Sequence, residues 1–325
     1  MTTRAERASG TLWGQAVGDA LGTTVEFASA ATIGRPRQDR WPTDLVGQGP
    51  FHVAAGQVTD DTELALSLAR SLVRQGGYDE DDVATAYARW RTSDPFDCGQ
   101  ATDQAFGRGL VRGPGLAARM RQRASQKTQA NGSLMRSSPL GIFGAALPRL
   151  ELARLAAADS QLSHPDPVCQ AACAVYVTTV ADAISTGLPG PELYARALRF
   201  AAETELIAPV RDTLEAASHA LPLSDGESQG WVRLALQHAF FHLAHATDFE
   251  AALVATVRMG GDTDTNGAIA GALLGAALGE AAIPSRWRET VRDCLPQRPV
   301  EYRCADLGEL AAALSGSSTV AAQFR

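Results

Sequence analysis

The chain has 325 residues, of which 45% are hydrophobic and 20% are charged, so it can bury a large core and is too apolar to be intrinsically disordered. Its 36 acidic and 29 basic residues give a formal net charge of −7, and no basic cluster offsets it, which disfavours nucleic acid as the main partner. The five cysteines are scattered and fit neither a disulfide framework nor paired metal ligands, so we expect a globular protein of the reducing cytoplasm.

The sequence gives no sign of membrane association. The first ten residues contain no apolar stretch of the kind found in secretory leaders. The longest apolar run, residues 267–279, is shorter than the roughly 20 residues of a membrane-spanning helix. We therefore expect neither a targeting segment nor a membrane partner.

Alanine and leucine dominate the sequence and alternating β-branched runs are almost absent, which predicts helices from end to end. The expected fold class is all-α, a single compact multi-helix bundle domain. In chain order, the expected helices cover residues 10–22, 61–75, 79–92, 98–111, 133–145, 150–160, 166–186, 190–204, 208–219, 228–244, 248–257, 264–279, 285–292 and 306–314.

The same pattern sets the expected domain organisation. We expect a flexible N-terminal tail at 1–9, one folded domain over 10–314 and a frayed C-terminal tail at 315–325. Segments 32–58 and 112–132 are long and rich in glycine, proline, glutamine and arginine. Because long loops in compact domains are usually functional, we expect these two at the rim of a cleft.

Two of the expected helices carry glycine at every fourth position. Each helical glycine costs roughly 1 kcal/mol relative to alanine, so a stripe of them needs a compensating gain. Small faces allow helix axes to approach more closely than the usual ~8–10 Å. We predict that both helices lie at the centre of one bundle, although a glycine-rich and alanine-rich sequence can also produce such spacing by chance. The glycines are Gly14, Gly18 and Gly22 in the first helix, and Gly267, Gly271, Gly275 and Gly279 in the second.

The clearest chemical signal is a pair of acidic clusters, at residues 59–62 (TDDT) and 262–265 (DTDT), each directly before an apolar helical run. One interpretation is ordinary helix capping, because Asp and Thr accept hydrogen bonds from free N–H groups. A single cap needs fewer groups, however, and concentrated carboxylates repel unless a cation neutralises them. Asp and Thr oxygens suit Mg²⁺, Mn²⁺ or Ca²⁺, so we favour a hard-metal site.

Other two-metal or metal-loop families fit less well. The ligand spacing differs from that of an EF-hand loop. A prenyl-diphosphate enzyme would need a further acid one helical turn after each cluster, but the sequence has Leu64 after the first and only Asn266 after the second.

Five segments together resemble the ADP-ribosylglycohydrolase family. They are GDALGTTVEF (18–27), TDDTELAL (59–66), NGSLMRSSPLG (131–141), SHPDP (163–167) and MGGDTDTNGAIAGALLGA (259–276). The matches follow the family order from residue 10 to residue 280. The resemblance implies one α-helical domain that binds two divalent cations, Mg²⁺ or Mn²⁺, and hydrolyses the bond between ADP-ribose and its acceptor.

The resemblance also assigns roles to individual residues. It implies that Glu26 is the catalytic carboxylate, whereas without it a surface glutamate would be the simpler interpretation. It implies that Asp264 bridges both cations. The implied metal ligands are Thr59, Asp60, Asp61, Asp262, Asp264 and Thr265.

A second set of residues is implied for substrate binding. The segment Ala130 to Arg136 is typical of a glycine turn that enters a helix, where N–H groups can bind a diphosphate. Ala130 departs from the glycine that family members often have there. A plain helix cap remains the alternative for several of these residues. The implied substrate-binding residues are Asp97, Asn131, Gly132, Ser133, Met135 and His164.

The expected substrate is an ADP-ribosylated protein or a small ADP-ribose conjugate, with arginine-linked ADP-ribose as first choice. Serine-linked ADP-ribose, O-acetyl-ADP-ribose and modified nucleic acid stay open, because the loops at 32–58 and 112–130 would select the acceptor. Two rivals also remain: a non-catalytic ADP-ribose-binding protein on the same fold, and a two-metal phosphohydrolase that releases phosphate.

Five conspicuous residues receive structural interpretations. His238, His242 and His245 have ligand-like spacing on one helix, but the zinc-protease pattern needs a glutamate where Ala239 stands, so we expect surface or interface histidines. Cys169 and Cys173, one helical turn apart, are expected in the core.

Overall fold

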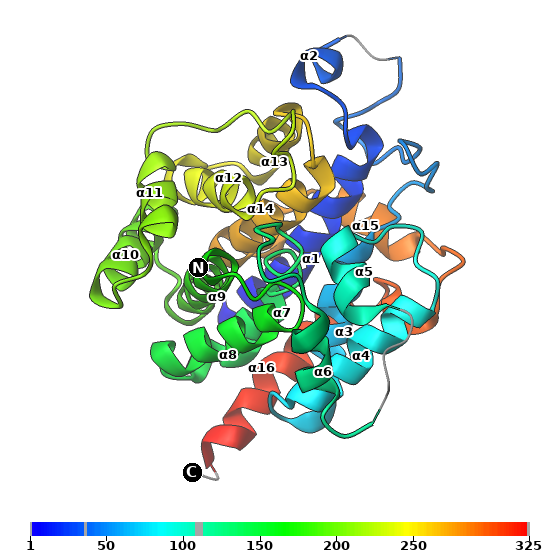
Figure 1. Ribbon diagram of the computed structural model, residues 1–325. Coiled ribbons are helices and arrows are strands. Elements are labelled where there is room, and N and C mark those ends of the chain that lie inside the picture. Colours follow the sequence, from blue (N-terminus) through cyan, green and yellow to red (C-terminus); the bar gives the residue numbers. More distant parts are fainter. Residues whose placement is uncertain (1, 36–37, 108–112, 324–325) are drawn as a thin grey trace.

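The computed structural model describes residues 2–35, 38–107 and 113–323, with side chains as far as residue 316. The regular secondary structure of this part of the chain is helical, and its extended pairings are two isolated β-bridges, so the all-α prediction is confirmed. The described residues form sixteen α-helices and four short 3₁₀ helices, and Figure 1 shows how the α-helices are arranged. The α-helices are α1 (Arg4–Gly22), α2 (Ala30–Ile33), α3 (Asp60–Gln75), α4 (Glu80–Thr92), α5 (Gln100–Phe106), α6 (Leu116–Arg123), α7 (Ser138–Phe143), α8 (Arg149–Gln161), α9 (Pro167–Thr186), α10 (Gly190–Glu203), α11 (Ala208–Ala216), α12 (Val232–His245), α13 (Phe249–Arg258), α14 (Thr263–Leu278), α15 (Ser285–Asp293) and α16 (Leu307–Gln323).

Helices α1 and α14 lie side by side at the centre of the bundle, and the other helices surround them (Figure 1). Their glycines face each other so closely that the backbones touch. A Cβ atom on Gly18 would lie 2.1 Å from the carbonyl oxygen of Gly267, and one on Gly271 would lie 2.1 Å from that of Gly14. The central packing predicted from the two glycine stripes is therefore confirmed, and it joins residues from opposite ends of the sequence in one domain.

Helix α9 forms a second buried layer and packs against α7, α8, α10, α12 and α14. By its length and composition, α9 is apolar enough to span a membrane. The longest uninterrupted apolar run, at 267–279, does not indicate this. In the structure, 89% of the most apolar window of α9 is buried inside the protein, as in the core helix of a soluble protein. Cys169 and Cys173 are buried on this helix as free thiols, which confirms their core assignment.

Both predicted tails are partly helical. Helix α1 begins at Arg4 rather than at residue 10, because Thr3 and Glu6 form a capping box and Ala8 is already buried. Helix α16 continues past residue 314 to Gln323, so the predicted C-terminal tail is helical as far as that residue. Residues 324–325 of that tail lie outside the described residues.

The two long segments also contain helix. Segment 112–132 includes α6, whose Leu116 and Met120 are buried, and segment 32–58 begins with the last two residues of the short α2. The helix expected at 133–145 begins only at Ser138, because residues 131–137 form consecutive turns. The helix expected at 98–111 covers 100–106, and residues 108–112 lie outside the described residues.

The prediction for the three histidines of α12 was wrong for two of them. His238 and His242 are buried, because α12 packs between α10, α11 and α14, and only His245 is exposed. His238 shares a hydrogen bond with Ser224 through its Nε2 atom. Burial, together with the neighbouring His242, lowers the pKa of His238 to about 3.

The central glycine contact gives a stability prediction. We expect Gly271→Ala to lower the free energy of unfolding by about 3 kcal/mol or more, because the new methyl group must force the two backbones apart. Urea denaturation measures the loss. The control is Gly308→Ala on α16, where the nearest atom to a new Cβ lies 3.9 Å away. Alanine should be neutral or stabilising there, and equal effects at both sites would contradict close backbone packing.

The buried His238 gives a pH prediction. The pKa of His238 is lowered in the folded state. Below about pH 6.5 the unfolded chain therefore binds a proton at this residue, whereas the folded chain does not. As a result, the free energy of unfolding falls as the pH falls. Between pH 7 and pH 5, this one residue lowers the free energy of unfolding by about 2 kcal/mol. We expect His238→Gln to lose less stability than the wild type over that interval by about this amount. Parallel pH profiles would refute a neutral buried imidazole.

Candidate active site

The first acidic cluster begins helix α3 and is held there by a residue of α1. Asp19, fully buried, accepts hydrogen bonds from the backbone N–H of Thr59 at 3.1 Å and of Thr62 at 3.2 Å, and from the Thr62 hydroxyl at 2.6 Å. Asp19 thus supplies the cap from outside the helix. The N-cap side chain of Thr59 makes no capping hydrogen bond, nor does that of Asp262 at the start of α14. Neither N-cap residue serves the capping role that the sequence left open.

The second acidic cluster lies beside Glu26. Gly260 and Gly261 both have left-handed backbones, with φ of 76° and 73°, where a side chain would be strained. The N–H of Phe27 donates to the carbonyl oxygen of Gly261 at 2.8 Å, and the N–H of Gly261 donates to that of Ala28 at 2.9 Å. This pair of hydrogen bonds joins the segment after α1 to the turn before α14.

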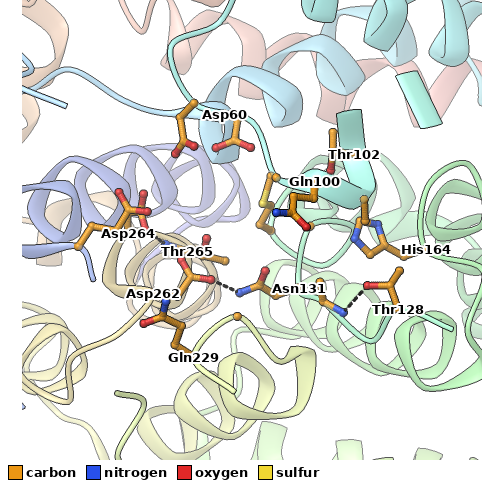
Figure 2. A pocket seen from close by; sticks show the side chains of 18 of the residues that line it. Asp60, Gln100, Thr102, Thr128, Asn131, His164, Gln229, Asp262, Asp264 and Thr265 are labelled. Carbon is orange, nitrogen blue, oxygen red and sulfur yellow. Dashed lines mark hydrogen bonds between the residues drawn. The ribbon is translucent and has the colours of Figure 1, made fainter. Parts of the chain in front are cut away.

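These connections bring six carboxylates into one group, which we call the acidic end. One carboxylate oxygen each from Glu26, Asp97 and Asp264 lie within 4.8 Å of one another. Figure 2 shows Asp60, Asp262 and Asp264 on the same side of the cleft. The six residues of the acidic end are Glu26, Asp60, Asp61, Asp97, Asp262 and Asp264.

Burial and mutual repulsion raise the pKa of these carboxyl groups. Burial, followed by the charges of Asp97 and Asp262, raises the pKa of Glu26 to about 9. Burial and the charge of Asp262 raise the pKa of Asp97 to about 6. The pKa values of Asp60 and Asp264 lie well above their usual range, first because of burial and then because of acidic neighbours. A cation among these groups would offset the repulsion.

Several donor atoms of the acidic end fit a metal ion. Asp61 Oδ1 and Glu26 Oε2 are buried without a hydrogen-bond partner among the described residues, as are both amide atoms of Asn266. Asp61 Oδ2 accepts hydrogen bonds from the hydroxyls of Thr59 at 3.1 Å and Thr265 at 3.3 Å. The ligand atoms that lie close together there, among the described residues, are carboxylate oxygens, which hard divalent cations prefer.

The opposite side of the cleft contains a group of uncharged residues, Thr102, Asn131, Gly132 and His164, which we call the polar end. Asn131 donates to Asp262 Oδ2 at 2.6 Å and so connects the two ends (Figure 2). Gly132 is required by the close approach of two side chains, because a Cβ there would lie 2.8 Å from His164 Cε1 and 3.1 Å from Thr102 Oγ1. Burial and the charge of Arg136 lower the pKa of His164 to about 3, so its ring is neutral at physiological pH.

Two buried residues hold the polar end in position. Arg136 pairs with Asp159 at 3.1 Å and donates to the carbonyl oxygen of Gly132 at 3.0 Å and to Ser163 Oγ at 2.7 Å. Gln15 of α1 donates to the carbonyl oxygens of Asp61 and Met135, both at 3.0 Å. Its amide therefore ties the turn at 131–137 to the first acidic cluster. The sequence interpretation assigned no role to Gln15 or to Asp19.

Together the two ends line a cleft of about 580 Å³. Most of the residues predicted for the site face it, including Glu26, Asp97 and Met135. Ser133 does not. It is fully buried behind the wall, where its hydroxyl accepts a hydrogen bond from Ser160 at 2.9 Å, because the chain turns there instead of starting a helix. Thr59 and Asp61 also lie behind the lining residues, where the Thr59 hydroxyl donates to Asp61 Oδ2 at 3.1 Å.

Part of the wall was not predicted. Glu227, Gln229 and Gly230 line the cleft from the segment between α11 and α12, and Gln100 and Thr102 line it from α5. The sequence shows only the serine and glycine content of the first segment as a signal, and residues 228–230 were assigned to a helix. Segment 112–132 reaches the cleft through its last residues, as the loop prediction required.

The chain matches a family model described as ADP-ribosylglycohydrolase over residues 1–322. It is 32% identical over 284 residues to the ADP-ribosyl-[dinitrogen reductase] glycohydrolase of Rhodospirillum rubrum, which covers 87% of this chain and 89% of that protein. It is 30% identical over 296 residues to the ADP-ribosylarginine hydrolase Tri1 of Pseudomonas putida (strain GB-1), which covers 88% of this chain and 74% of that protein.

A solved structure has a similar fold over nearly the whole chain. It is described as an ADP-ribosylglycohydrolase-related protein complex and superposes with a TM-score of 0.76 at 30% sequence identity. The alignment covers 97% of this chain and 99% of that one. The likeness therefore includes the helices that form both ends of the cleft.

Proposed function

Since the chain belongs to the ADP-ribosylglycohydrolase family, we propose that it hydrolyses the glycosidic bond between ADP-ribose and an arginine side chain. One observation carries the proposal: a single cleft contains a buried carboxylate cluster at one end and a neutral polar turn at the other. An ADP-ribose conjugate needs both, because its diphosphate must avoid the carboxylates while its scissile bond needs acid and base groups. The relative named for ADP-ribosylarginine supports arginine as the acceptor, and the relative named for dinitrogen reductase supports a modified protein as the substrate.

The acidic end would hold two divalent cations, Mg²⁺ or Mn²⁺. Asp60, Asp61 and Thr59 would contribute ligands from the start of α3, and Asp262, Asp264 and Thr265 from the start of α14. Bound cations would supply positive charge that orients ribose hydroxyls and polarises water. Asp97 lies close enough to Glu26 and Asp264 to contribute either to the metals or to the substrate.

Glu26 is the proposed acid and base. The reaction adds water across the bond between the anomeric carbon and the acceptor nitrogen, so the ribose gains a hydroxyl and the leaving guanidine gains a proton. A carboxyl group whose pKa is raised by burial can keep a proton near neutral pH and deliver it to a leaving group. Its carboxylate form then accepts the proton that water loses, which completes the cycle.

The polar end is proposed to bind the diphosphate side of the substrate. His164 stays neutral, and Asn131 and Thr102 offer polar groups around the glycine of the turn. Serine-linked ADP-ribose and O-acetyl-ADP-ribose would use the same groups and remain alternative substrates. Release of free ADP-ribose from ADP-ribosyl-arginine, followed by chromatography with and without Mg²⁺ or Mn²⁺, tests the reaction directly.

The proposed metal site gives a stability prediction. A ligand that binds only the folded state adds about 2.7 kcal/mol at a hundredfold excess over its dissociation constant. We therefore expect a higher melting temperature with Mn²⁺ than with EDTA. Asp264→Asn should abolish the difference, whereas Asp293→Asn on the exposed end of α15 should keep it. Equal melting curves for the wild type in both buffers would count against a folded-state metal site.

The proposed role of Glu26 gives a kinetic prediction. Glu26→Gln preserves the shape of the side chain but cannot transfer a proton, and loss of a positioned acid or base typically lowers the rate ~10²- to 10⁴-fold. We expect this loss in single-turnover release of ADP-ribose, with ADP-ribose affinity retained. Glu289→Gln, on an exposed face of α15, should behave like the wild type.

The outcomes of this measurement separate the rival functions. Unchanged release by Glu26→Gln would remove Glu26 from the mechanism. A non-catalytic binder would show no turnover even in the wild type, and a phosphohydrolase would release phosphate in place of ADP-ribose.

A further inference from the structure

Phe27 is exposed at the entrance of the cleft, directly after Glu26. Its side chain is 55% exposed, although phenylalanine usually lies inside a protein. It lines both the main cleft and an adjoining hollow that also includes Val25 and Pro50. A large apolar side chain in this position covers little of the core, so its place calls for another explanation.

The backbone of Phe27 is held in a disfavoured conformation. Its φ of 62° lies in the left-handed region, which is uncommon for residues other than glycine and asparagine. The hydrogen bond from the Phe27 N–H to the carbonyl oxygen of Gly261, in the turn before α14, holds this conformation. Strained residues of this kind concentrate at ligand sites, where the surrounding structure fixes the direction of the side chain.

Two further phenylalanines support the ring. Phe51 lies edge-on to Phe27 with ring centroids 6.4 Å apart, and Phe96 lies edge-on to Phe51 at 5.5 Å. We call these three residues the aromatic rim. Phe27 follows Glu26 in the sequence and Phe96 precedes Asp97, so the rim borders the two carboxylates that Asp264 brings together.

The location of the rim indicates which part of the substrate it would meet. If the diphosphate lies at the polar end and the anomeric carbon near Glu26, as in the proposed function, the leaving group extends past Glu26 toward Phe27. Aromatic faces attract cations, and a guanidinium is planar and can stack on a ring. The nearby carboxylate of Asp97, whose pKa is about 6, adds attraction for a positive group near neutral pH.

We propose that Phe27 is a specificity-determining residue whose exposed ring stacks on the guanidinium of an ADP-ribosylated arginine and so favours arginine over neutral acceptors. This inference rests on the proposed function, because it assigns a contact to the leaving group of that reaction. Exposed cation–π contacts predict a change of about 2- to 5-fold in affinity.

The test compares ligands with and without the acceptor. Binding of ADP-ribosyl-arginine and of ADP-ribose is measured by calorimetry in the Glu26→Gln background with Mg²⁺, for Phe27, Phe27→Asn and Phe27→Trp. Asparagine tolerates the left-handed backbone but removes the ring, whereas tryptophan keeps a strong cation-binding face. Leu150→Asn on α8, at the same exposed fraction of 55%, is the matched control.

We expect Phe27→Asn to weaken binding of ADP-ribosyl-arginine about 2- to 5-fold and to leave binding of ADP-ribose unchanged, with Phe27→Trp close to the parent protein. With Glu26 intact, Phe27→Asn should raise KM for ADP-ribosyl-arginine and leave hydrolysis of ADP-ribosyl-serine unaffected. Equal weakening of both ligands would mean that the ring contacts ADP-ribose itself, and no weakening of either would exclude the contact; both results overturn the inference.

The same experiment separates the inference from the proposed function. If Phe27→Asn selectively weakens binding of ADP-ribosyl-arginine but the wild type does not hydrolyse it, the stacking contact of Phe27 is supported and the proposed hydrolase function is refuted. If the wild type hydrolyses ADP-ribosyl-arginine and Phe27→Asn does not change this activity, the proposed function is supported and the stacking contact is refuted. Failure of the Glu26→Gln protein to bind either ligand would overturn the inference.

Discussion

Direct contact between the backbones of α1 and α14 is the constraint on which the site depends. It exists because glycines remove the Cβ atoms that would otherwise hold the two helices apart. The contact fixes the end of α1 against the start of α14, where the hydroxyl of Thr263 donates to the carbonyl oxygen of Gly22 at 2.8 Å. From there Asp19 sets the first turn of α3 and the hydrogen bonds at Gly261 set Glu26. Five of the six carboxylates of the acidic end are therefore positioned from one helix pair, and Asp97 joins them from the segment before α5.

The two ends of the cleft handle charge in different ways. At the acidic end, like charges are concentrated in a buried place, and the repulsion is left for a cation to neutralise. Behind the polar end, the buried Arg136 has its partner within the protein, and its guanidinium also stacks 4.7 Å from the centre of the Tyr87 ring. The charge of Arg136 is thus paired within the protein, whereas the charges of the acidic end are left for a bound cation to neutralise.

Local patterns predicted the fold and the two acidic clusters, whereas Glu26, Asp97 and His164 were assigned from the family resemblance. Glycine spacing identified the central pair, and paired carboxylates identified the acidic end, because both signals are carried by residues close together in sequence. Burial was harder to predict. His238 and His242 are buried by helices far away in the sequence, so their own helix gives no sign of it. The burial of Ser133 behind the wall and the place of Gln229 in the cleft depend on the path of irregular turns. Neither periodicity nor composition determines that path.

The central helix pair also affects the order in which the protein can be completed during synthesis. Gly22 and Thr263, which meet in the structure, are 241 positions apart in the sequence. Translation proceeds at roughly 5–20 residues per second, so the glycine face of α1 waits on the order of ten to fifty seconds for its partner. Until α14 leaves the ribosome, the emerging chain has an uncovered small-residue face and a carboxylate cluster that lacks its second half. A nascent chain would therefore gain its cleft only late in translation, in a single step with the closing of the core.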